Sequence, residues 1–272
     1  MATIPFAQID AFARRPFEGN QACVMPLDAF LPDAILQKIA AENNVAETAF
    51  IVPQNDGVWA LRWFTPATEV PLCGHATLAA GHYLYSIAGF DGDQITFQTR
   101  QSGELFVSRQ SDGRLAMDFP AQSFTQVAPD PEIVAALGQA PLRCFTGPCY
   151  VAQYATAAEI RGLSPDLERL KSLGTSDGKW GLGNFGCLAL EGEGVDVTSR
   201  FFAPGSGIPE DPATGSWHCM VAPLVKHLSG ADTAQCFQAY PGRGARIETE
   251  LVGDRVLLRG ASVTVIEGVF NL

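Results

Sequence analysis

The sequence lacks the features that would assign it to nucleic-acid-binding or membrane proteins. No stretch is rich in Lys and Arg, and the formal net charge is −11 at pH 7. We therefore expect no nucleic-acid partner, because phosphate binding needs clustered positive charge. No apolar run approaches the roughly 18 residues that cross a bilayer. The longest small-apolar stretch, Ala76 to Ala88, is broken by Gly81 and His82, so we expect no membrane contact.

Cysteine also lacks the spacing that indicates a disulfide scaffold or a metal site. The chain has 7 cysteines, an odd number without a Cys-x-x-Cys pair. The first residues, MATIPFAQIDAF, have neither the basic nor the apolar segment of a secretory signal. We therefore predict free thiols in a reducing cytoplasm. His82, His218 and His227 show no ligand spacing with His75, so the sequence predicts no metal.

The chain contains an internal repeat of one segment. Residues 62–77 read RWFTPATEVPLCGHAT, and residues 200–215 read RFFAPGSGIPEDPATG. When the two arginines are aligned, a pair of aromatic residues and two prolines also match. A repeat at about half the chain length predicts two similar halves. Beyond the second matched proline the segments differ: the first has Cys73 and His75, and the second has Asp211. This difference predicts a site between the halves, to which each half contributes a different group that can accept or donate a proton.

The order of secondary-structure signals predicts an α+β protein. Strand-like segments outnumber helix-like ones, and a helix follows each repeated turn, near 75–88 and near 214–228. We predict two similar halves, each a curved, mostly antiparallel sheet around a central helix. The first half is 1–118 and the second 119–261, which opens on a Pro- and Ser-containing linker at 119–131. The closing strand, 262–272, is a candidate to complete the first half.

Both repeated turns lead into a helix, whose first backbone N–H groups are free to bind an anion. Gly74 with His75 begins the first helix, and Gly215 with Ser216 begins the second. Helix N-termini attract carboxylates through these groups and the helix dipole. Ordinary N-capping explains either turn taken alone. Their duplication favours the binding of one small anionic carboxylate.

The groups that differ between the turns are suited to proton transfer. Cys73 and Asp211 are equivalent in the alignment of the repeat, and a helix start is expected to lower the pKa of each. A buried apolar role for Cys73 and a turn role for Asp211 stay open. His75, also at a helix start, is expected to be neutral and to hydrogen-bond a substrate carbonyl, or else to act as a simple cap.

Two further polar residues stand out at strand ends. Glu47 precedes the apolar strand AFIV, where partial desolvation is expected to raise the pKa of its carboxyl group towards a value useful for a general base. A rim position without a function is the alternative. Asn20 lies in a predicted turn, Gly19-Asn20-Gln21, which either contacts substrate or is a plain turn.

Taken together, these motifs resemble the PhzF family of phenazine-biosynthesis-like isomerases. The matching segments are FEGNQACV at 17–24, AENNVAETAFIV at 41–52, LRWFTPATEVPLCGHATLAAGHYL at 61–84 and RFFAPGSGIPEDPATGSWHC at 200–219. The resemblance implies a fold like that of diaminopimelate epimerase, with the catalytic cleft between two α/β halves. It also implies an enzyme without metal, pyridoxal phosphate or nicotinamide, and a homodimer.

The resemblance further implies a role for each matched residue. Glu47 falls at the position of the catalytic acid/base that moves a proton between carbons, while His75 and Asp211 fall at positions that bind or polarise substrate. The family's carboxylate-binding amides fall at the two helix starts, and Asn20 at a substrate contact. In the epimerase relatives two cysteines act as bases; here Cys73 retains one, and Asp211 replaces the other. Trp217 stands where the family often has Ala, so we expect a narrower pocket.

We therefore predict a cofactor-independent isomerase that acts on a small carboxylate. Glu47 would remove a proton from carbon, and its return at another carbon would shift a double bond. A two-base epimerase or racemase that uses Cys73 is one alternative. A catalytically silent carboxylate binder is another. A hydrolase that uses Cys73 and His75 is disfavoured, because no third orienting group is evident.

Overall fold

The computed structural model describes residues 3–175 and 180–272. The chain folds into two compact units, which we call unit 1 (Met1–Phe119 with Arg259–Leu272) and unit 2 (Pro120–Leu258). The sequence boundaries placed the end of the first half at residue 118 and its closing strand from residue 262. In the structure the first part of unit 1 ends one residue later, at Phe119, and its second part begins three residues earlier, at Arg259. No helix in the described part of the chain is both long and apolar enough to cross a bilayer.

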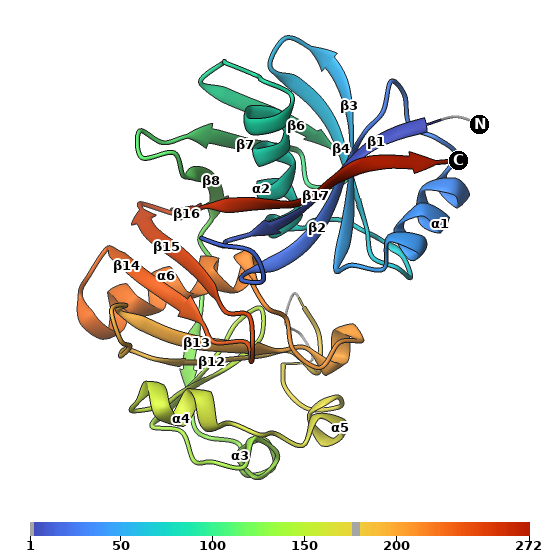
Figure 1. Ribbon diagram of the computed structural model, residues 1–272. Helices are drawn as coiled ribbons and strands as arrows, with labels where there is room; N and C mark the ends of the chain where they lie inside the picture. Colours follow the sequence, from blue (N-terminus) through green and yellow to red (C-terminus); the bar gives the residue numbers. More distant parts are fainter. Residues whose placement is uncertain (1–2, 176–179) are drawn as a thin grey trace. The chain divides into compact units, whose positions relative to one another are not determined.

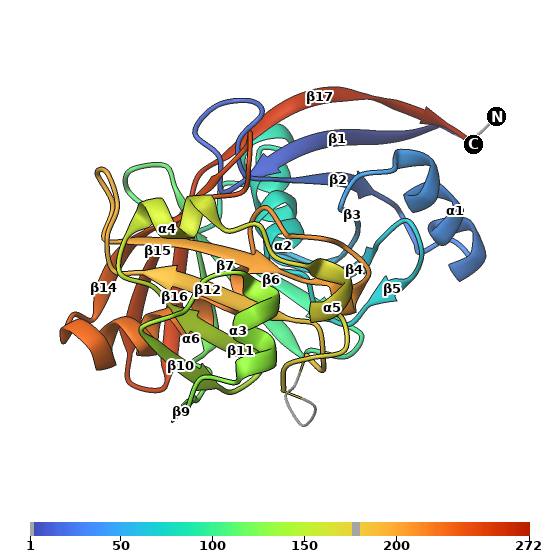
Figure 2. The same cartoon turned by 90° about the horizontal axis from the view of Figure 1, so that it is seen from below.

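Unit 1 is a mixed sheet that curves around one helix (Figure 1). The strands lie in the order β17-β1-β2-β3-β4-β6-β7-β8, with the short β5 paired to β4. Their bounds are Thr3–Ala11 (β1), Asn20–Pro26 (β2), Glu47–Asn55 (β3), Val58–Phe64 (β4), Glu69–Val70 (β5), Gln94–Thr99 (β6), Glu104–Arg109 (β7), Leu115–Pro120 (β8) and Ser262–Asn271 (β17). The last strand of the chain therefore belongs to the sheet of unit 1: β17 pairs antiparallel with β1, and Figure 2 shows these two strands beside β2.

The helix at the centre of unit 1 is α2 (Gly74–His82), which continues into a π-helical turn, η1 (Tyr83–Ile87). It packs against β1, β2, β3, β7 and β17. Every residue from His75 to Gly81 is buried, which explains the small side chains in this segment. A Cβ at Gly81 would lie 2.7 Å from Cγ1 of Val107, so the sheet touches the helix backbone here. The peripheral helix α1 (Asp33–Asn43) ends at Asn44 in the left-handed region, with φ 48°.

Unit 2 has its own mixed sheet, in the order β9-β10-β11-β12-β13-β14-β15, and β16 follows β15 through a tight turn. The strand bounds are Thr125–Val127 (β9), Arg143–Thr146 (β10), Tyr150–Gln153 (β11), Phe185–Ala189 (β12), Val197–Phe202 (β13), Thr233–Gln238 (β14), Ala245–Val252 (β15) and Arg255–Gly260 (β16). The helices are Pro131–Leu137 (α3), Ala157–Gly162 (α4), Leu167–Leu170 (α5), Pro204–Ser206 (the 3₁₀ turn η2) and Gly215–Ser229 (α6). The division between the units falls at the start of the segment expected as a linker, 119–131, but that segment is not a plain linker, because β9 within it pairs with β10.

The two sheets repeat one pattern of strand directions. From β1 through β2, β3, β4 and β6 to β7, successive pairs are antiparallel, parallel, antiparallel, parallel and antiparallel. The series from β10 to β15 has the same sequence of directions. The helices also correspond, since α2 lies between β4 and β6 in the chain and α6 between β13 and β14. The prediction of an α+β protein with two similar halves is confirmed.

The matched arginines of the repeat hold the same ion pair in each unit. Arg62 on β4 donates from Nε and Nη2 to the two carboxylate oxygens of Glu69, at 2.8 Å each. Arg200 on β13 binds Glu210 in the same two-pronged way, at 2.7 Å each. Each guanidinium also lies over the aromatic ring two positions later in the chain, Phe64 for Arg62 and Phe202 for Arg200. The central guanidinium carbon of Arg62 is 5.1 Å from the ring centre of Phe64. The repeat therefore encodes a clamp between a strand and the turn that follows it.

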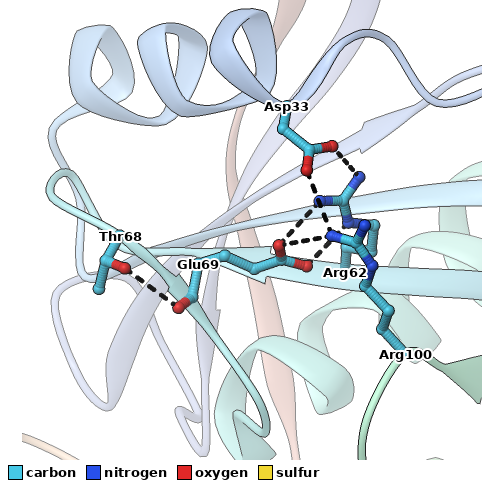
Figure 3. A network of polar contacts seen from close by, with 5 residues as sticks. All are labelled: Asp33, Arg62, Thr68, Glu69 and Arg100. Atoms are coloured by element: carbon cyan, nitrogen blue, oxygen red, sulfur yellow. Dashed lines mark hydrogen bonds and ion pairs between the residues drawn. The ribbon is translucent and has the colours of Figure 1, made fainter.

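The surroundings of the two clamps differ (Figure 3). Arg62 also contacts Asp33, at 2.9 Å, and Arg100 joins both acids, so the cluster holds two cations and two anions. Hydrogen bonds from the Arg62 guanidinium are the main reason why the pKa of Glu69 is lowered. Arg200 instead donates its remaining Nη1 to the carbonyl oxygens of Ile160 and Leu163. Within the described part of the chain, Glu210 is thus the only acid that pairs with Arg200.

This difference predicts unequal effects of the same substitution in the two clamps. Glu210→Gln leaves a guanidinium whose side chain is only 7% exposed without an acid, and we expect it to destabilise the protein by about 3 kcal/mol. Glu69→Gln leaves Asp33 on Arg62, and we expect about 1 kcal/mol. Urea unfolding of both variants measures the difference. Equal losses, or a larger loss for Glu69→Gln, would contradict the assignment.

Candidate active site

Four of the side chains singled out in the sequence meet at the start of α2 in unit 1. His75 Nε2 lies 2.9 Å from Glu47 Oε2, and His75 Nδ1 lies 3.2 Å from Asn20 Nδ2. Cys73 Sγ lies 3.5 Å from Nδ1 and 3.9 Å from Nε2 of the same ring. Asn20, Cys73 and His75 are buried, and the Glu47 side chain is 17% exposed. The histidine is therefore the centre of a compact, largely dry polar cluster.

The secondary structure explains why these residues meet. Asn20 and Glu47 are the first residues of β2 and β3. These strands run parallel, with Ala22 opposite Glu47, so both side chains start from the same edge of the sheet. The helix α2 packs on both strands, and its N-cap is Cys73, with Gly74 and His75 as its first two residues. The helix start is thus held against the strand ends.

The expected protonation of Cys73 is wrong. A helix start by itself lowers the pKa of a thiol, but burial, together with the Glu47 carboxylate, raises the pKa of Cys73 to about 11. Desolvation penalises the thiolate more than the partial charge of the helix end favours it. The thiol therefore carries its proton at neutral pH, which makes it a poor base.

The expectation that the helix start keeps His75 neutral is also wrong. Burial by itself lowers the pKa of the imidazolium, but negative charge at Cys73 and Glu47 outweighs burial and raises the pKa well above its ordinary value. Since the Cys73 thiol holds its proton, we attribute the shift to the Glu47 carboxylate, 2.9 Å away. His75 is therefore held as an imidazolium beside the Glu47 carboxylate.

Asn20 keeps a partner for His75 in either protonation state. As oriented, the Asn20 amide nitrogen donates to Nδ1, which places the ring proton of neutral His75 on Nε2, facing Glu47. If the ring gains a second proton, a turned amide presents its oxygen to Nδ1 instead. Asn20 is therefore a positioning residue that tolerates proton transfer at the ring.

The structure also corrects the equivalence of Cys73 and Asp211. Glu69 lies seven positions after its clamp arginine, whereas Glu210 lies ten positions after its own. Both acids pair with the aromatic residue at the end of the preceding strand, Phe64 in unit 1 and Phe202 in unit 2. The turn of unit 2 is thus longer by three positions (ten minus seven), and the 3₁₀ turn η2 lies in it. With this correction the N-cap Cys73 matches the N-cap of α6, Thr214.

The first helical turns support the corrected match. In α2 the Thr77 hydroxyl donates to the carbonyl oxygen of Cys73, at 2.6 Å. In α6 the Nδ1 atom of His218 lies 2.8 Å from the carbonyl oxygen of Thr214. Both bonds run from the fourth residue of the helix to its N-cap, and both residues are buried. The alignment that matches Glu69 with Glu210 therefore also matches Thr77 with His218.

Asp211 belongs to a separate polar cluster in unit 2. Its Oδ2 accepts a hydrogen bond from the Thr214 hydroxyl at 2.6 Å, and its backbone carbonyl accepts one from Gln238 Nε2 at 2.6 Å. Gln238 Oε1 also accepts from the Thr214 backbone N–H, at 2.9 Å. Gln238 ends β14, and nothing in the local sequence around it indicates this role. Gly215 and Ser216 follow as the first two residues of α6.

The expectation that Trp217 narrows a pocket is wrong. Trp217 is fully buried in the core of unit 2, with its ring 6.0 Å from that of Phe201. A Cβ at Gly186 on β12 would lie 2.3 Å from the Trp217 ring, so the glycine makes room for the indole. The residue is a packing element.

His218 predicts a pH dependence of stability. Its donor bond to Thr214 puts the proton on Nδ1, and Nε2 has no hydrogen-bond partner among the described residues. Burial lowers the pKa of His218 to about 4, against about 6.5 in an unfolded chain. The unfolded chain therefore gains the proton first, so stability is fully present above pH 6.5 and is lost as the pH falls towards 4.

We expect His218→Gln to remove the part of the stability loss at low pH that is due to protonation of His218. The wild-type free energy of unfolding should lose about 3 kcal/mol more than that of the variant between pH 6.5 and 4. Urea unfolding over that range measures both curves. Parallel curves would show that His218 gains its proton without cost.

Comparisons with known proteins agree with this architecture. The family model described as PhzC-PhzF, phenazine biosynthesis-like protein, matches residues 9–268. The chain is 40% identical over 273 residues to an uncharacterized isomerase of Pseudomonas aeruginosa, with 99% of each chain covered. It is 34% identical to a crystal structure of a PhzF family phenazine biosynthesis protein from Enterococcus faecalis, with a TM-score of 0.93 and all of both chains covered.

A more distant structure is similar in fold alone. A predicted epimerase from Pseudomonas aeruginosa is 22% identical, with a TM-score of 0.74 over 97% of this chain and 98% of that one. The predicted fold class, α+β and diaminopimelate epimerase-like, is thus confirmed.

Proposed function

This chain belongs to the phenazine biosynthesis-like (PhzC-PhzF) family and is an isomerase of that family, and we propose that it moves a proton between carbons of a small carboxylate without a cofactor. In this proposal Glu47 is the base that removes the proton and the acid that returns it. His75 stabilises the negative charge that develops between these steps. A double bond shifts as the proton moves.

The observation that carries the proposal is the ion pair between Glu47 and His75. A carboxylate and an imidazole 2.9 Å apart supply both an acceptor for a carbon-bound proton and a donor for an enolate oxygen. Their burial strengthens both interactions, because water does not compete. Asn20 holds the ring from its other nitrogen.

The helix start supplies the remaining contact in unit 1. Gly74 and His75 are the first two residues of α2, so their backbone N–H groups have no intrahelical acceptor. A substrate carboxylate at this point gains hydrogen bonds and the favourable end of the helix dipole. Bound in this way, the carboxylate places its α-carbon beside Glu47, within the same cluster.

The internal repeat supports a single base. In unit 1 Phe64 pairs with Thr48, the residue after Glu47, and in unit 2 the matching Phe202 pairs with Phe185. The residue that corresponds to Glu47 is therefore Asn184. Its amide nitrogen donates to the carbonyl oxygens of Trp180 and Leu182. Unit 2 thus offers a neutral, engaged amide where unit 1 has a carboxylate.

The same repeat disfavours the two-base epimerase. That mechanism needs two groups that exchange protons from opposite faces of the carbon. Burial keeps the Cys73 thiol protonated, with a pKa of about 11, and its counterpart at the start of α6 is Thr214. A threonine hydroxyl is far too weak a base for this purpose. Asp211, Gly215 and Ser216 stay predicted substrate contacts, and a cytoplasmic homodimer stays a prediction.

The proposal predicts that Glu47→Gln abolishes proton exchange. The protein is incubated in D₂O with small unsaturated and amino carboxylates, and carbon-bound hydrogen is followed by NMR. We expect exchange or isomerisation in the wild type and a loss of at least about 10²-fold in Glu47→Gln, because a positioned acid/base contributes 10²–10⁴-fold. Glu42→Gln, an exposed position on α1, is the matched control. Undiminished exchange in Glu47→Gln would remove the assignment of the base, and binding without exchange in the wild type would favour a silent carboxylate binder.

A second prediction concerns Asp211. We expect Asp211→Asn to lower kcat and to raise KM together, because the variant loses a negative charge while it retains an acceptor for the Thr214 hydroxyl. Asp232→Asn, which alters an exposed ion pair with Lys226, is the control. Wild-type kinetics in Asp211→Asn would show that the cluster in unit 2 does not act on the substrate.

A further inference from the structure

We propose that Glu47, Cys73 and His75 form a binding site for Zn²⁺, and that the bound ion inhibits the enzyme. The site itself stands on geometry alone, and the inhibition rests on the function proposed above. Histidine spacing in the sequence predicts no metal, but that spacing compares histidines only with one another. The ligands identified by the structure come from two separate elements, β3 and the start of α2.

The distances between the ligand atoms suit one tetrahedral ion. One oxygen, one sulfur and one nitrogen atom from the three residues all lie within 4.8 Å of one another. His75 Nε2 lies 2.9 Å from Glu47 Oε2 and 3.9 Å from Cys73 Sγ. Zinc bonds of about 2.0 Å to nitrogen and oxygen and about 2.3 Å to sulfur separate tetrahedral ligands by about 3.3–3.6 Å. The two pairs that include His75 need shifts of a few tenths of an ångström, and the Glu47 oxygen and Cys73 Sγ, within 4.8 Å of each other, close towards the same point.

The orientation of Glu47 points to the same conclusion. Its Oε2 atom is buried and has no hydrogen-bond partner among the described residues, although Nε2 is only 2.9 Å away. The two atoms are therefore close without being aligned as donor and acceptor. Two ligands of one ion have this relation, because each aims its lone pair at a third point. A buried orphan oxygen also requires some compensation.

The chemistry of the donor set favours zinc. A thiolate, an imidazole and a carboxylate are its usual protein ligands, and three of them leave a fourth position for water. The Asn20 amide lies 3.2 Å from the other ring nitrogen; turned so that its oxygen accepts from Nδ1–H, it acts as the outer partner of a metal-bound histidine. On binding, the ion takes the place of the thiol proton of Cys73 and of the Nε2 proton of the His75 imidazolium; both protons leave to solvent, and the ring keeps its proton on Nδ1.

Occupation of this site would stop the proposed reaction. The Glu47 oxygen that would accept the carbon-bound proton becomes a ligand of the ion, and the imidazole loses the Nε2 proton with which it would stabilise the developing charge. The metal and the catalytic proton therefore compete for the same lone pairs. Inhibition of this kind is reversible, and a chelator removes it.

The first experiment measures binding without turnover. The full-length protein is freed of metal with a chelator and titrated with Co²⁺, which reports a thiolate ligand through a near-ultraviolet charge-transfer band. Competition with a chromophoric chelator then gives the stoichiometry and affinity for Zn²⁺. We expect one site, with a band that is absent in Cys73→Ser. We expect Glu47→Gln, which removes a ligand but changes the shape little, to bind at least about tenfold more weakly.

Two controls separate the site from unspecific binding. Cys236→Ser removes another buried thiol, in unit 2, and Glu42→Gln removes an exposed carboxylate; both should bind like the wild type. A missing band in the wild type, a band that persists in Cys73→Ser, or equal weakening in the controls would overturn the site.

The second experiment tests inhibition. Stoichiometric Zn²⁺ should suppress D₂O exchange in the wild type, and chelator should restore it. Full exchange with the site occupied would overturn the inhibition. If the wild type shows no exchange with any carboxylate, the proposed function fails, while the cobalt spectrum still decides the metal site.

Discussion

In each unit, an ion pair between a buried arginine and a glutamate fixes the turn that leads into the central helix. In unit 1 the clamp joins Arg62 on β4 to Glu69, four residues before the N-cap of α2. In unit 2 Arg200 and Glu210 make the same two-pronged contact before α6. A guanidinium with five fixed donors imposes an orientation as well as a distance. The helix starts that carry Cys73, His75 and Thr214 therefore inherit their positions from an ion pair outside the polar clusters.

Within unit 1 the chemistry follows from a competition between burial and charge. Burial alone would leave both Cys73 and His75 neutral. The Glu47 carboxylate adds to burial at the thiol and opposes it at the imidazole, so it raises the pKa of both groups. The one carboxylate therefore helps to keep the Cys73 thiol protonated and unreactive, and it keeps the neighbouring His75 ring able to carry a proton. Asn20 makes the ring tolerant of either charge state.

Much of this architecture could be predicted from the sequence because it is written in the repeat. The matched Arg and aromatic residues indicated two similar halves, and His75 lies in the repeated segment itself; Glu47 was indicated separately, by its position before the apolar strand AFIV. The equivalence of Cys73 with Asp211 failed because the matched prolines concealed a turn that is longer in unit 2. The three-residue difference in turn length becomes clear from Glu69 and Glu210, the two acids that bind the matched arginines. Their equivalence is recognisable only from these ion pairs in the structure.

The protonation states could not be predicted for a different reason. Local sequence reports a helix start, whose partial charge acts over one turn. It does not report that β2 and β3 bring Asn20 and Glu47 to that start, or that Cys73 is buried there. Trp217 shows the same limit, since the glycine that accommodates its ring lies on β12, a separate strand that comes well before α6 in the chain.

The longer turn of unit 2 has a consequence for how such a protein diversifies. A clamp fastened at both ends isolates the loop between them, so residues can be inserted there without moving the strand or the helix. The reactive groups themselves lie outside that loop: in the corrected alignment Asp211 matches Val70 and Cys73 matches Thr214, so these positions differ by substitution. In a fold with this internal repeat, the length of the clamped loop and the identity of the groups at the helix start can therefore differ independently between the two units.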